Sequence, residues 1–378
     1  MRSKRANLKR SKMKKFNLKK CVAANVAKMS GYVPGEQPAG GGWTKLNTNE
    51  FPYPPSPKVI DAIKNEIGPD AASLRLYPNP ASSKLREQIG NYFGVPAECA
   101  FAANGSDDAL NLVIRAFTDD NLKVATLDPS YSLYPVLAKI QGSKLIDIPF
   151  KKNVEIDFDK IFSCGANILF FTNPNAPTGV GFPIETVEKI VQNFDGLVLV
   201  DEAYAPFADY TAAPLVEKYE NLIVTGTTSK GWALAGMRVG WVIANPDIIA
   251  VLDIVRDSYN LDRLAQAAGV AALADASYYA QKCGAVISER TETERFFDSL
   301  GWKYHKSSAN FIFFKPVRNG KTGAKIAKDL FEFLRENKIL TRYFASEKKV
   351  SDGIRLTIGT PEQMKEFKKA AMKWAGKK

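Results

Sequence analysis

The chain has 378 residues, 52 of them Lys or Arg and 40 of them Asp or Glu, which gives a formal net charge of +12 at pH 7. Because a single hydrophobic core stops growing at about 250–300 residues, this length predicts two domains. Residues 1–20 hold ten basic residues and no acid. The rest of the chain therefore holds 42 basic and 40 acidic residues, whose charges nearly cancel. We therefore expect a disordered basic tail over residues 1–30 and a nearly neutral body that binds no nucleic acid.

The residue inventory excludes several classes of active site. His305 is the only histidine, which removes Ser-His-Asp and Cys-His catalysis and His-bound zinc sites. The four cysteines are far apart and form no CxxC pair, as is typical of a reducing compartment without a structural metal. The sequence also lacks an apolar run of about 18 residues that could cross a membrane. We expect a cytoplasmic protein whose protons are moved by Lys, carboxylate or Tyr side chains.

In chain order, the Gly triplet at residues 40–42 predicts a flexible connector within an N-terminal arm, residues 31–50. From residue 95 to about 262, short apolar runs alternate with helical patterns such as those at 107–117 and 183–193. The apolar runs are typical of strands buried on both faces, and they lie at 124–127, 168–171, 197–200, 222–224 and 239–243. This alternation predicts an α/β fold with a mostly parallel sheet, in a large domain over residues 51–275.

The pattern changes after residue 262. A long helical stretch, 264–299, has an expected break near Ala276-Ser277. It is followed by a strand at 311–314, an amphipathic helix that carries Ile326, Leu330, Phe333 and Leu334 on one face, a strand at 355–358 and a helix at 361–374. These elements predict a smaller C-terminal α+β domain over residues 276–378.

Polar residues follow each of the first four apolar runs of the large domain. They are Asp128-Pro129, Asn173-Pro174, Asp201-Glu202 and residues 227–230. Because ligands of parallel sheets bind beyond the carboxyl ends of the strands, these residues predict one shared site. Lys230 is flanked by hydroxyls and followed eight positions later by Arg238, which suits an imine bond to an aldehyde cofactor that carries a phosphate.

Residues 227–240 (TTSKGWALAGMRVG), 200–204 (VDEAY) and 104–108 (NGSDD) together carry a family resemblance. From about residue 31 to the C-terminus the chain resembles the class I/II aminotransferases of fold type I, and within them the histidinol-phosphate aminotransferases. The resemblance implies pyridoxal 5'-phosphate as the cofactor, a large cofactor-binding domain, a smaller C-terminal domain and a homodimer. It implies no metal.

Three residues carry the chemistry that the resemblance implies. Lys230 would bind the cofactor aldehyde and move the substrate proton. Asp201 would keep the ring nitrogen protonated, and Tyr204 would hydrogen-bond the phenolic oxygen. Taken alone, Asp201 fits an ordinary turn residue at a strand end equally well.

Cofactor phosphate binding is implied for the amides of Ser106 and Asp107 and for the side chains of Thr227, Ser229 and Arg238. A helix N-terminus and a fixed cation suit a phosphate group. Ser106 is also a plausible helix cap, and both readings can hold together.

For two further cofactor contacts the sequence allows more than one explanation. Tyr131 matches a ring that stacks on the cofactor, although core packing explains a Tyr there almost as well. Residues 173–179 (NPNAPTG) depart from the family pattern, because Ala176 stands where an Asn contacts the phenolic oxygen. We expect Asn175 or Tyr204 to supply that hydrogen bond.

Substrate binding is implied for Arg355 and Arg342, which would hold a substrate phosphate or carboxylate, with an ordinary salt bridge as the alternative. Tyr32 and Tyr77 match residues that reach phosphates across a dimer interface. Tyr32 would contact the substrate, and Tyr77 would contact the cofactor.

The implied reaction moves an amino group between a small-molecule amino donor and a 2-oxo acid. The preferred pair would be L-histidinol phosphate and 2-oxoglutarate, in histidine biosynthesis. Alternatives are an aromatic amino-acid aminotransferase and a threonine-phosphate decarboxylase-like lyase, since the same Lys and Asp serve all three. A non-catalytic effector domain with a DNA-binding head is disfavoured, because residues 1–20 lack the apolar face that such a head needs.

Overall fold

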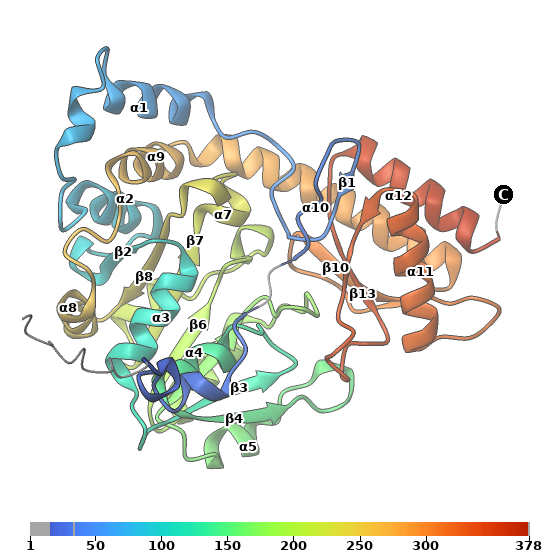
Figure 1. Ribbon diagram of the computed structural model, residues 1–378, viewed down its shortest axis with the longest axis horizontal. Helices are drawn as coiled ribbons and strands as arrows, with labels where there is room; N and C mark the ends of the chain where they lie inside the picture. The colour runs from blue at the N-terminus through green and yellow to red at the C-terminus, as the bar shows by residue number, and fades with distance from the viewer. Residues whose placement is uncertain (1–15, 33–34, 377–378) are drawn as a thin grey trace, which may run out of the picture.

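The computed structural model describes residues 16–32 and 35–376. Figure 1 shows a large domain on the left and a smaller domain on the right, with the long helix α10 (Ala276–Leu300) running from one to the other. Most of the expected basic tail, residues 1–15, lies outside the described residues. The part of the tail that the structure describes forms two short 3-10 turns, Leu18–Lys20 and Val26–Lys28, and Asn25 Nδ2 donates to Ile140 O at 2.7 Å.

The large domain is built on a seven-stranded sheet in the order β2-β8-β7-β6-β5-β3-β4. Strand β8 is antiparallel to both of its neighbours, whereas the pairings among β7, β6, β5, β3 and β4 are parallel. The strands are β2 (Ala100–Ala103), β3 (Lys123–Asp128), β4 (Lys144–Pro149), β5 (Ile168–Thr172), β6 (Leu197–Asp201), β7 (Leu222–Thr227) and β8 (Gly240–Ala244). The predicted α/β fold with a mostly parallel sheet is confirmed.

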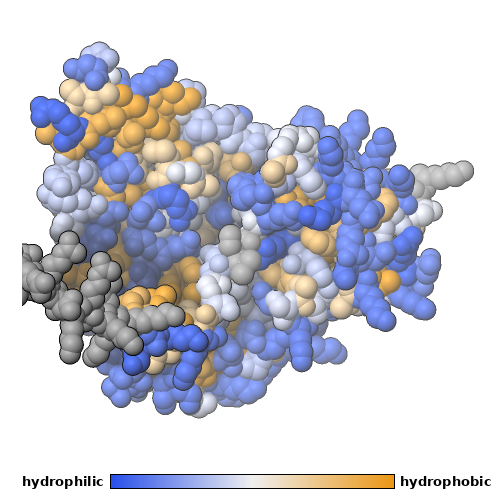
Figure 2. Space-filling view, in the orientation of Figure 1, coloured by the Kyte–Doolittle hydropathy of each residue, from blue (hydrophilic) through white to orange (hydrophobic). Residues whose placement is uncertain are grey.

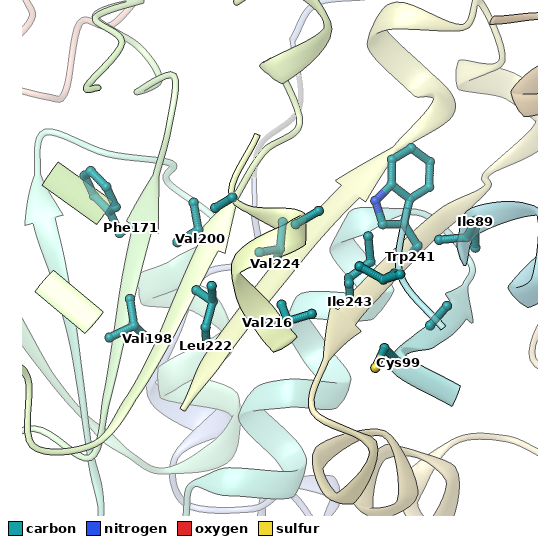
Figure 3. Packing of buried hydrophobic residues seen from close by; sticks show 14 of the residues in the cluster. Ile89, Cys99, Phe171, Val198, Val200, Val216, Leu222, Val224, Trp241 and Ile243 are labelled. Atoms are coloured by element: carbon teal, nitrogen blue, oxygen red, sulfur yellow. The ribbon is translucent and has the colours of Figure 1, made fainter. Parts of the chain in front are cut away.

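Helices cover both faces of this sheet because its central strands are apolar on both sides. The helices are α1 (Pro57–Ile67), α2 (Ser83–Phe93), α3 (Ser106–Phe117), α4 (Tyr134–Gln141), α5 (Phe158–Ser163), α6 (Ile184–Asn193), α7 (Thr228–Gly231), α8 (Pro246–Val255) and α9 (Arg263–Ala274). Side chains alternate along β6, so Val198 and Val200 pack on one face with α2, α6 and α9, while Leu199 packs on the other with α3, α4 and α8. Figure 3 shows part of the first cluster, with Ile89 and Trp241 at one side of it.

The small domain is built on a four-stranded antiparallel sheet in the order β12-β13-β10-β9. Its elements are β9 (Lys303–Tyr304), β10 (Phe311–Lys315), α11 (Ala324–Glu336), β11 (Ile339–Leu340), β12 (Arg342–Tyr343), β13 (Ile354–Thr357) and α12 (Pro361–Trp374). An aromatic core joins the sheet to α10. Phe297, Trp302 and Phe314 form one aromatic cluster, with Phe297 stacked on Phe314 at 4.4 Å and Trp302 stacked on Phe314 at 5.2 Å between ring centroids.

The N-terminal arm packs against the small domain and then enters the large one. Strand β1 (Thr44–Lys45) pairs in parallel with β11, and Thr357 N donates to Leu46 O at 3.0 Å. Helix α1 then lies against α9 at the edge of the large domain. Residues 47–49 are therefore held between the two domains.

The helical break expected near residue 276 falls at Asp275, which lies between α9 and α10. The expected strands and helices of the small domain also form, within a residue or two of their expected limits. Two strands of the seven-stranded sheet, β2 and β4, were not expected from the sequence, and neither were the two-residue strands β1, β9, β11 and β12. Among residues 16–32 and 35–376, no helix combines the length and apolar composition that crossing a bilayer requires.

Phe297→Ala should lower the free energy of unfolding by about 3–5 kcal/mol, because it empties a fully buried site between two aromatic rings. Phe296→Ala, at the half-buried neighbouring position, is the matched control and should cost clearly less. Urea unfolding of both variants measures the difference. Equal losses would contradict the packing described for this core.

Candidate active site

A cavity of about 220 Å³ lies at the carboxyl ends of β5, β6 and β7, with walls from both domains and the arm. Twelve of the fourteen predicted site residues line it: Tyr32, Ser106, Asp107, Tyr131, Asp201, Tyr204, Thr227, Ser229, Lys230, Arg238, Arg342 and Arg355. Asn175 and Tyr77 do not line it. His305 also lies elsewhere, against a separate hollow beside Asp128 and Lys349.

Lys230 is placed by the turn that ends β7. Thr227 caps the short helix α7, and its hydroxyl accepts from Ser229 N at 3.1 Å. The Lys230 ammonium donates to the backbone oxygen of Thr48 at 3.1 Å. Burial, with Arg355 as the next cause, lowers the pKa of Lys230 to about 8. An amine with this pKa is neutral often enough near pH 7–8 to attack a carbonyl carbon or accept a proton.

Asp201 ends β6 and is 3% exposed. The Tyr134 hydroxyl donates to Asp201 Oδ2 at 2.7 Å, and Ala203 N donates to Oδ1 at 3.2 Å. Burial raises the pKa of this carboxyl to about 6, although both hydrogen bonds act in the opposite direction. Within the described part of the chain Asp201 forms no ion pair, so a cationic ligand atom would complete its site.

Tyr204 follows Asp201 by three residues and is almost fully buried. Asn49 Nδ2 donates to the Tyr204 hydroxyl at 2.8 Å, which leaves the hydroxyl hydrogen free for a ligand acceptor. Burial raises the pKa of Tyr204, while Arg355 opposes that shift. The phenol therefore stays protonated near neutral pH and can donate.

Asn175 does not occupy the position that the sequence suggested. Its Nδ2 donates to Pro129 O at 3.2 Å, and its Oδ1 accepts from the Thr178 hydroxyl at 2.7 Å. These bonds close the loop after β5, so both polar groups of the Asn175 side chain are already hydrogen-bonded to the protein. Ala176, the residue that departs from the family pattern, does line the cavity.

An anion site is formed at the start of α3. Arg238 lies 3.5 Å from the Asp107 carboxylate and donates to the Ser229 hydroxyl at 3.4 Å. Gly105, with φ +86°, permits this approach, because a Cβ there would lie 2.3 Å from Arg238 Nη2. The first N–H groups of a helix and a guanidinium together favour a phosphate group.

Tyr131 forms a wall between these two regions. Its hydroxyl donates to Asp107 Oδ1 at 3.2 Å. Its ring contacts Tyr32 edge-on at 6.0 Å and Tyr134 edge-on at 5.6 Å between centroids. The ring thus lies in the cavity wall and not in the middle of a core.

Arg342 and Arg355 are cross-strand neighbours on β12 and β13. Arg355 Nη2 donates to Asn47 O at 3.0 Å, but its Nε is buried without an acceptor, and the described residues give Arg355 no ion pair. Burial lowers the pKa of Arg355, and Arg342 adds to that effect. Like charges placed directly opposite on a sheet are unfavourable, so this pair favours an anionic ligand with several oxygens.

The two predicted interface tyrosines differ in position. Tyr32 lies in the cavity of its own chain beside Tyr131, since the arm folds back onto the same chain at β1. The contact of Tyr32 across a dimer interface stays a prediction. Tyr77 is 76% exposed and stacks on Tyr259 at 4.3 Å between ring centroids.

Several site residues were not anticipated from the sequence. They are the arm residues Thr48 and Asn49, the Asp201 partner Tyr134, and the loop residues Phe344 and Glu347, which also line the cavity. Tyr134 stands three residues after Tyr131, and this pairing of two tyrosines was the only local signal. Thr48 and Asn49 lie 182 and 155 positions along the chain from the groups that they contact.

Comparison with known proteins agrees with this geometry. Residues 42–370 match the family model for aminotransferase class I and II. The chain belongs to this family. The histidinol-phosphate aminotransferase of Geobacter sulfurreducens is 44% identical over 360 residues, which cover 93% of this chain and 99% of that protein. The enzyme of the same name from Syntrophotalea carbinolica is 45% identical over 347 residues, with 90% and 95% covered.

The aminotransferase fold is also seen in solved structures. The histidinol-phosphate aminotransferase of Sinorhizobium meliloti, solved in complex with pyridoxal-5'-phosphate, superposes with a TM-score of 0.79 at 22% identity. The match covers 88% of this chain and 90% of that one. The predicted fold-type I architecture, with a large and a small domain, is confirmed.

Pyridoxal 5'-phosphate is the cofactor of this aminotransferase family, and it supplies an aldehyde carbon and a ring that accepts electrons from a bond at the substrate Cα. The residues present fit it. Asp201 lacks a cationic partner, Lys230 is a neutralisable amine, and the start of α3 with Arg238 offers donors for a phosphate. The donors and acceptors of the cavity thus match the ring nitrogen, aldehyde and phosphate of the cofactor.

Asp201→Asn should stabilise the cofactor-free aminotransferase at pH 8 by on the order of 1 kcal/mol. Since burial raises the pKa of Asp201 to about 6, ionisation disfavours the folded state as pH rises from about 4 to 6. Asn cannot ionise, so its advantage should be largest at pH 8 and about half as large at pH 5. Thermal unfolding at both pH values tests this.

Asp253→Asn is the matched control for that substitution. At Asp253 burial is outweighed by hydrogen bonds from Arg86 and Arg256, so its pKa is lowered and its ionised form stabilises the fold above about pH 4. Asp253→Asn should therefore destabilise at pH 8. If both substitutions changed the stability at pH 8 in the same direction, the burial of Asp201 without a compensating charge would be contradicted.

Proposed function

We propose that this aminotransferase exchanges an amino group between L-histidinol phosphate and 2-oxoglutarate, giving imidazole acetol phosphate and glutamate, in histidine biosynthesis. The observation that carries the proposal is the facing pair Arg342 and Arg355, whose cavity position suits a phosphate on a small amine. Relatives named histidinol-phosphate aminotransferase, 38–45% identical over about nine-tenths of the chain, support it.

In the proposed mechanism Lys230 would hold the cofactor through its aldehyde carbon, and its amine, whose pKa burial lowers to about 8 in the cofactor-free protein, would move the proton at the substrate Cα. Asp201 would face the ring nitrogen and keep it protonated. Tyr204 donates to the phenolic oxygen, and we assign it the contact for which Asn175 was the alternative.

The two anion sites have separate roles in this proposal. Ser106, Asp107, Thr227, Ser229 and Arg238 hold the cofactor phosphate, and Tyr131 packs on the cofactor ring. Arg342 and Arg355 hold the substrate phosphate in one half-reaction and the glutamate carboxylate in the other, with Tyr32 beside them. One site serves both partners because phosphate and carboxylate each accept two guanidinium hydrogen bonds.

We further propose a cytoplasmic homodimer. Exposed apolar side chains gather around α1 and the segment after it, at Ile60, Leu74, Leu76 and Tyr77, and Figure 2 shows an apolar surface over α1. A contiguous apolar surface of this kind favours burial against another chain. Tyr77 would then reach the cofactor phosphate of the partner. All four cysteines are free, which suits a reducing compartment.

The division into domains follows from the same architecture. We propose a basic tail over 1–30, an arm over 31–50, a cofactor-binding domain over 51–275 and a small domain over 276–378. The two sheets fall on opposite sides of the Asp275 break, which supports the last boundary.

Purified holoenzyme should convert L-histidinol phosphate with 2-oxoglutarate and should be much slower with phenylalanine. Threonine phosphate should release no carbon dioxide. Glutamate formation and carbon dioxide release measure the three activities, and Lys230→Ala, which lacks the nucleophile, is the blank. Rapid turnover of phenylalanine without histidinol phosphate turnover would overturn the substrate assignment.

Arg355→Ala should raise the KM for L-histidinol phosphate about 100-fold, since a charged hydrogen-bonded contact contributes about 2–3 kcal/mol. The cofactor absorbance should persist, because Arg355 contacts the substrate and not the cofactor. Arg335→Ala, which removes an exposed pair with Glu36, is the control and should leave KM unchanged. An unaltered KM in Arg355→Ala would contradict the proposed role.

A further inference from the structure

A second cavity, of about 360 Å³, lies next to the active site but is separate from it. Gly231 and Trp232, the residues after Lys230, line this cavity, and so does Glu202, the residue after Asp201. Lys230 and Asp201 line the first cavity instead. Successive side chains at a strand end point to opposite faces of the sheet, so the two cavities lie back to back.

The wall of the second cavity is mainly aromatic. Tyr92 and Trp232 meet edge-to-face at 5.7 Å, Trp232 and Trp241 edge-to-face at 5.4 Å, and Phe93 lies 5.5 Å from Trp241 between ring centroids. Tyr279 adds a further ring from α10. A cation is attracted to the negative π face of an aromatic ring, so a wall of aromatic side chains favours an organic cation as the ligand.

Glu202 places a carboxylate in the same wall. It is 5% exposed, and its two oxygens accept from Ala212 N at 2.6 Å and from the Thr211 hydroxyl at 2.5 Å. No Lys, Arg or His of the described chain forms an ion pair with it. Burial raises the pKa of Glu202 to about 7, and neighbouring Asp201 adds to that effect. A cation in the cavity would supply the missing charge.

We propose that this second cavity binds a small organic cation. The aromatic rings and Glu202 contact the cationic nitrogen. The active-site cavity, with Lys230, Arg238, Arg342 and Arg355, favours ligands of net negative charge, whereas the second cavity, with Glu202, favours a ligand of net positive charge. The two cavities therefore take different ligands.

Titration calorimetry of the holoenzyme with choline and with 3,3-dimethyl-1-butanol tests the proposal. The two molecules have nearly the same shape and hydroxyl, but only choline is charged. Choline should bind saturably and at least about tenfold more tightly, as expected for a desolvated cation–π site with a carboxylate. Equal affinities, or no binding of choline, would overturn the proposal whether or not histidinol phosphate is a substrate.

Two variants locate the site. Glu202→Gln keeps the shape and an acceptor for Ala212 N, and it should abolish the preference for choline. Ala280→Phe fills the cavity from the exposed side of α10 without changing the core, and it should abolish binding of choline. Ala285→Phe, exposed on the same helix outside the cavity, is the matched control. Unchanged choline binding in Ala280→Phe would place the ligand elsewhere and overturn the assignment.

Discussion

Charges buried without counter-ions are the constraint on which the active site depends. Asp201, Lys230 and Arg355 are all enclosed at one cavity, yet within residues 16–32 and 35–376 none of them forms an ion pair. Burial therefore moves each pKa toward the neutral form of the group. Burying these groups without ion-pair partners lowers the stability of the cofactor-free protein, and ligands that bind in the cavity supply the missing opposite charges. Specificity follows, because a ligand must supply a cation at Asp201 and anions at the two arginine sites.

The arm between the domains holds this arrangement together. Thr48 O accepts from Lys230, Asn49 Nδ2 donates to Tyr204, and Asn47 O accepts from Arg355. These residues are in turn fixed by β1 on the small domain and by α1 on the large one. One short segment thus positions the amine of Lys230, the phenol of Tyr204 and the guanidinium of Arg355. A movement of the small domain would therefore shift the hydrogen-bond partners of all three groups.

The sequence was informative where the pattern was local. Apolar runs of three to five residues revealed the inner strands, and polar residues after them located the cavity. Strand β2 was missed because its four residues are mainly Ala, and β4 was missed because it is an edge strand with exposed Lys144 and Asp147. The contacts of Tyr134 and Thr48 were not foreseeable, since they join residues 67 and 182 positions apart. The sequence placed Asn175 close to the cavity, but it did not reveal the direction of its side chain, which the loop after β5 determines.

The pairing of β12 with β13 has a consequence for how this chain can vary. Because neighbouring residues of a strand face opposite ways, Arg355 points to the cavity only while Ile354 and Leu356 point to the core. Inserting one residue inside either strand would turn the guanidinium into the hydrophobic interior. The connecting loop, residues 344–353, can change its length without that inversion. Natural diversity and engineered substrate range should therefore concentrate in that loop and leave both flanking strands at constant length.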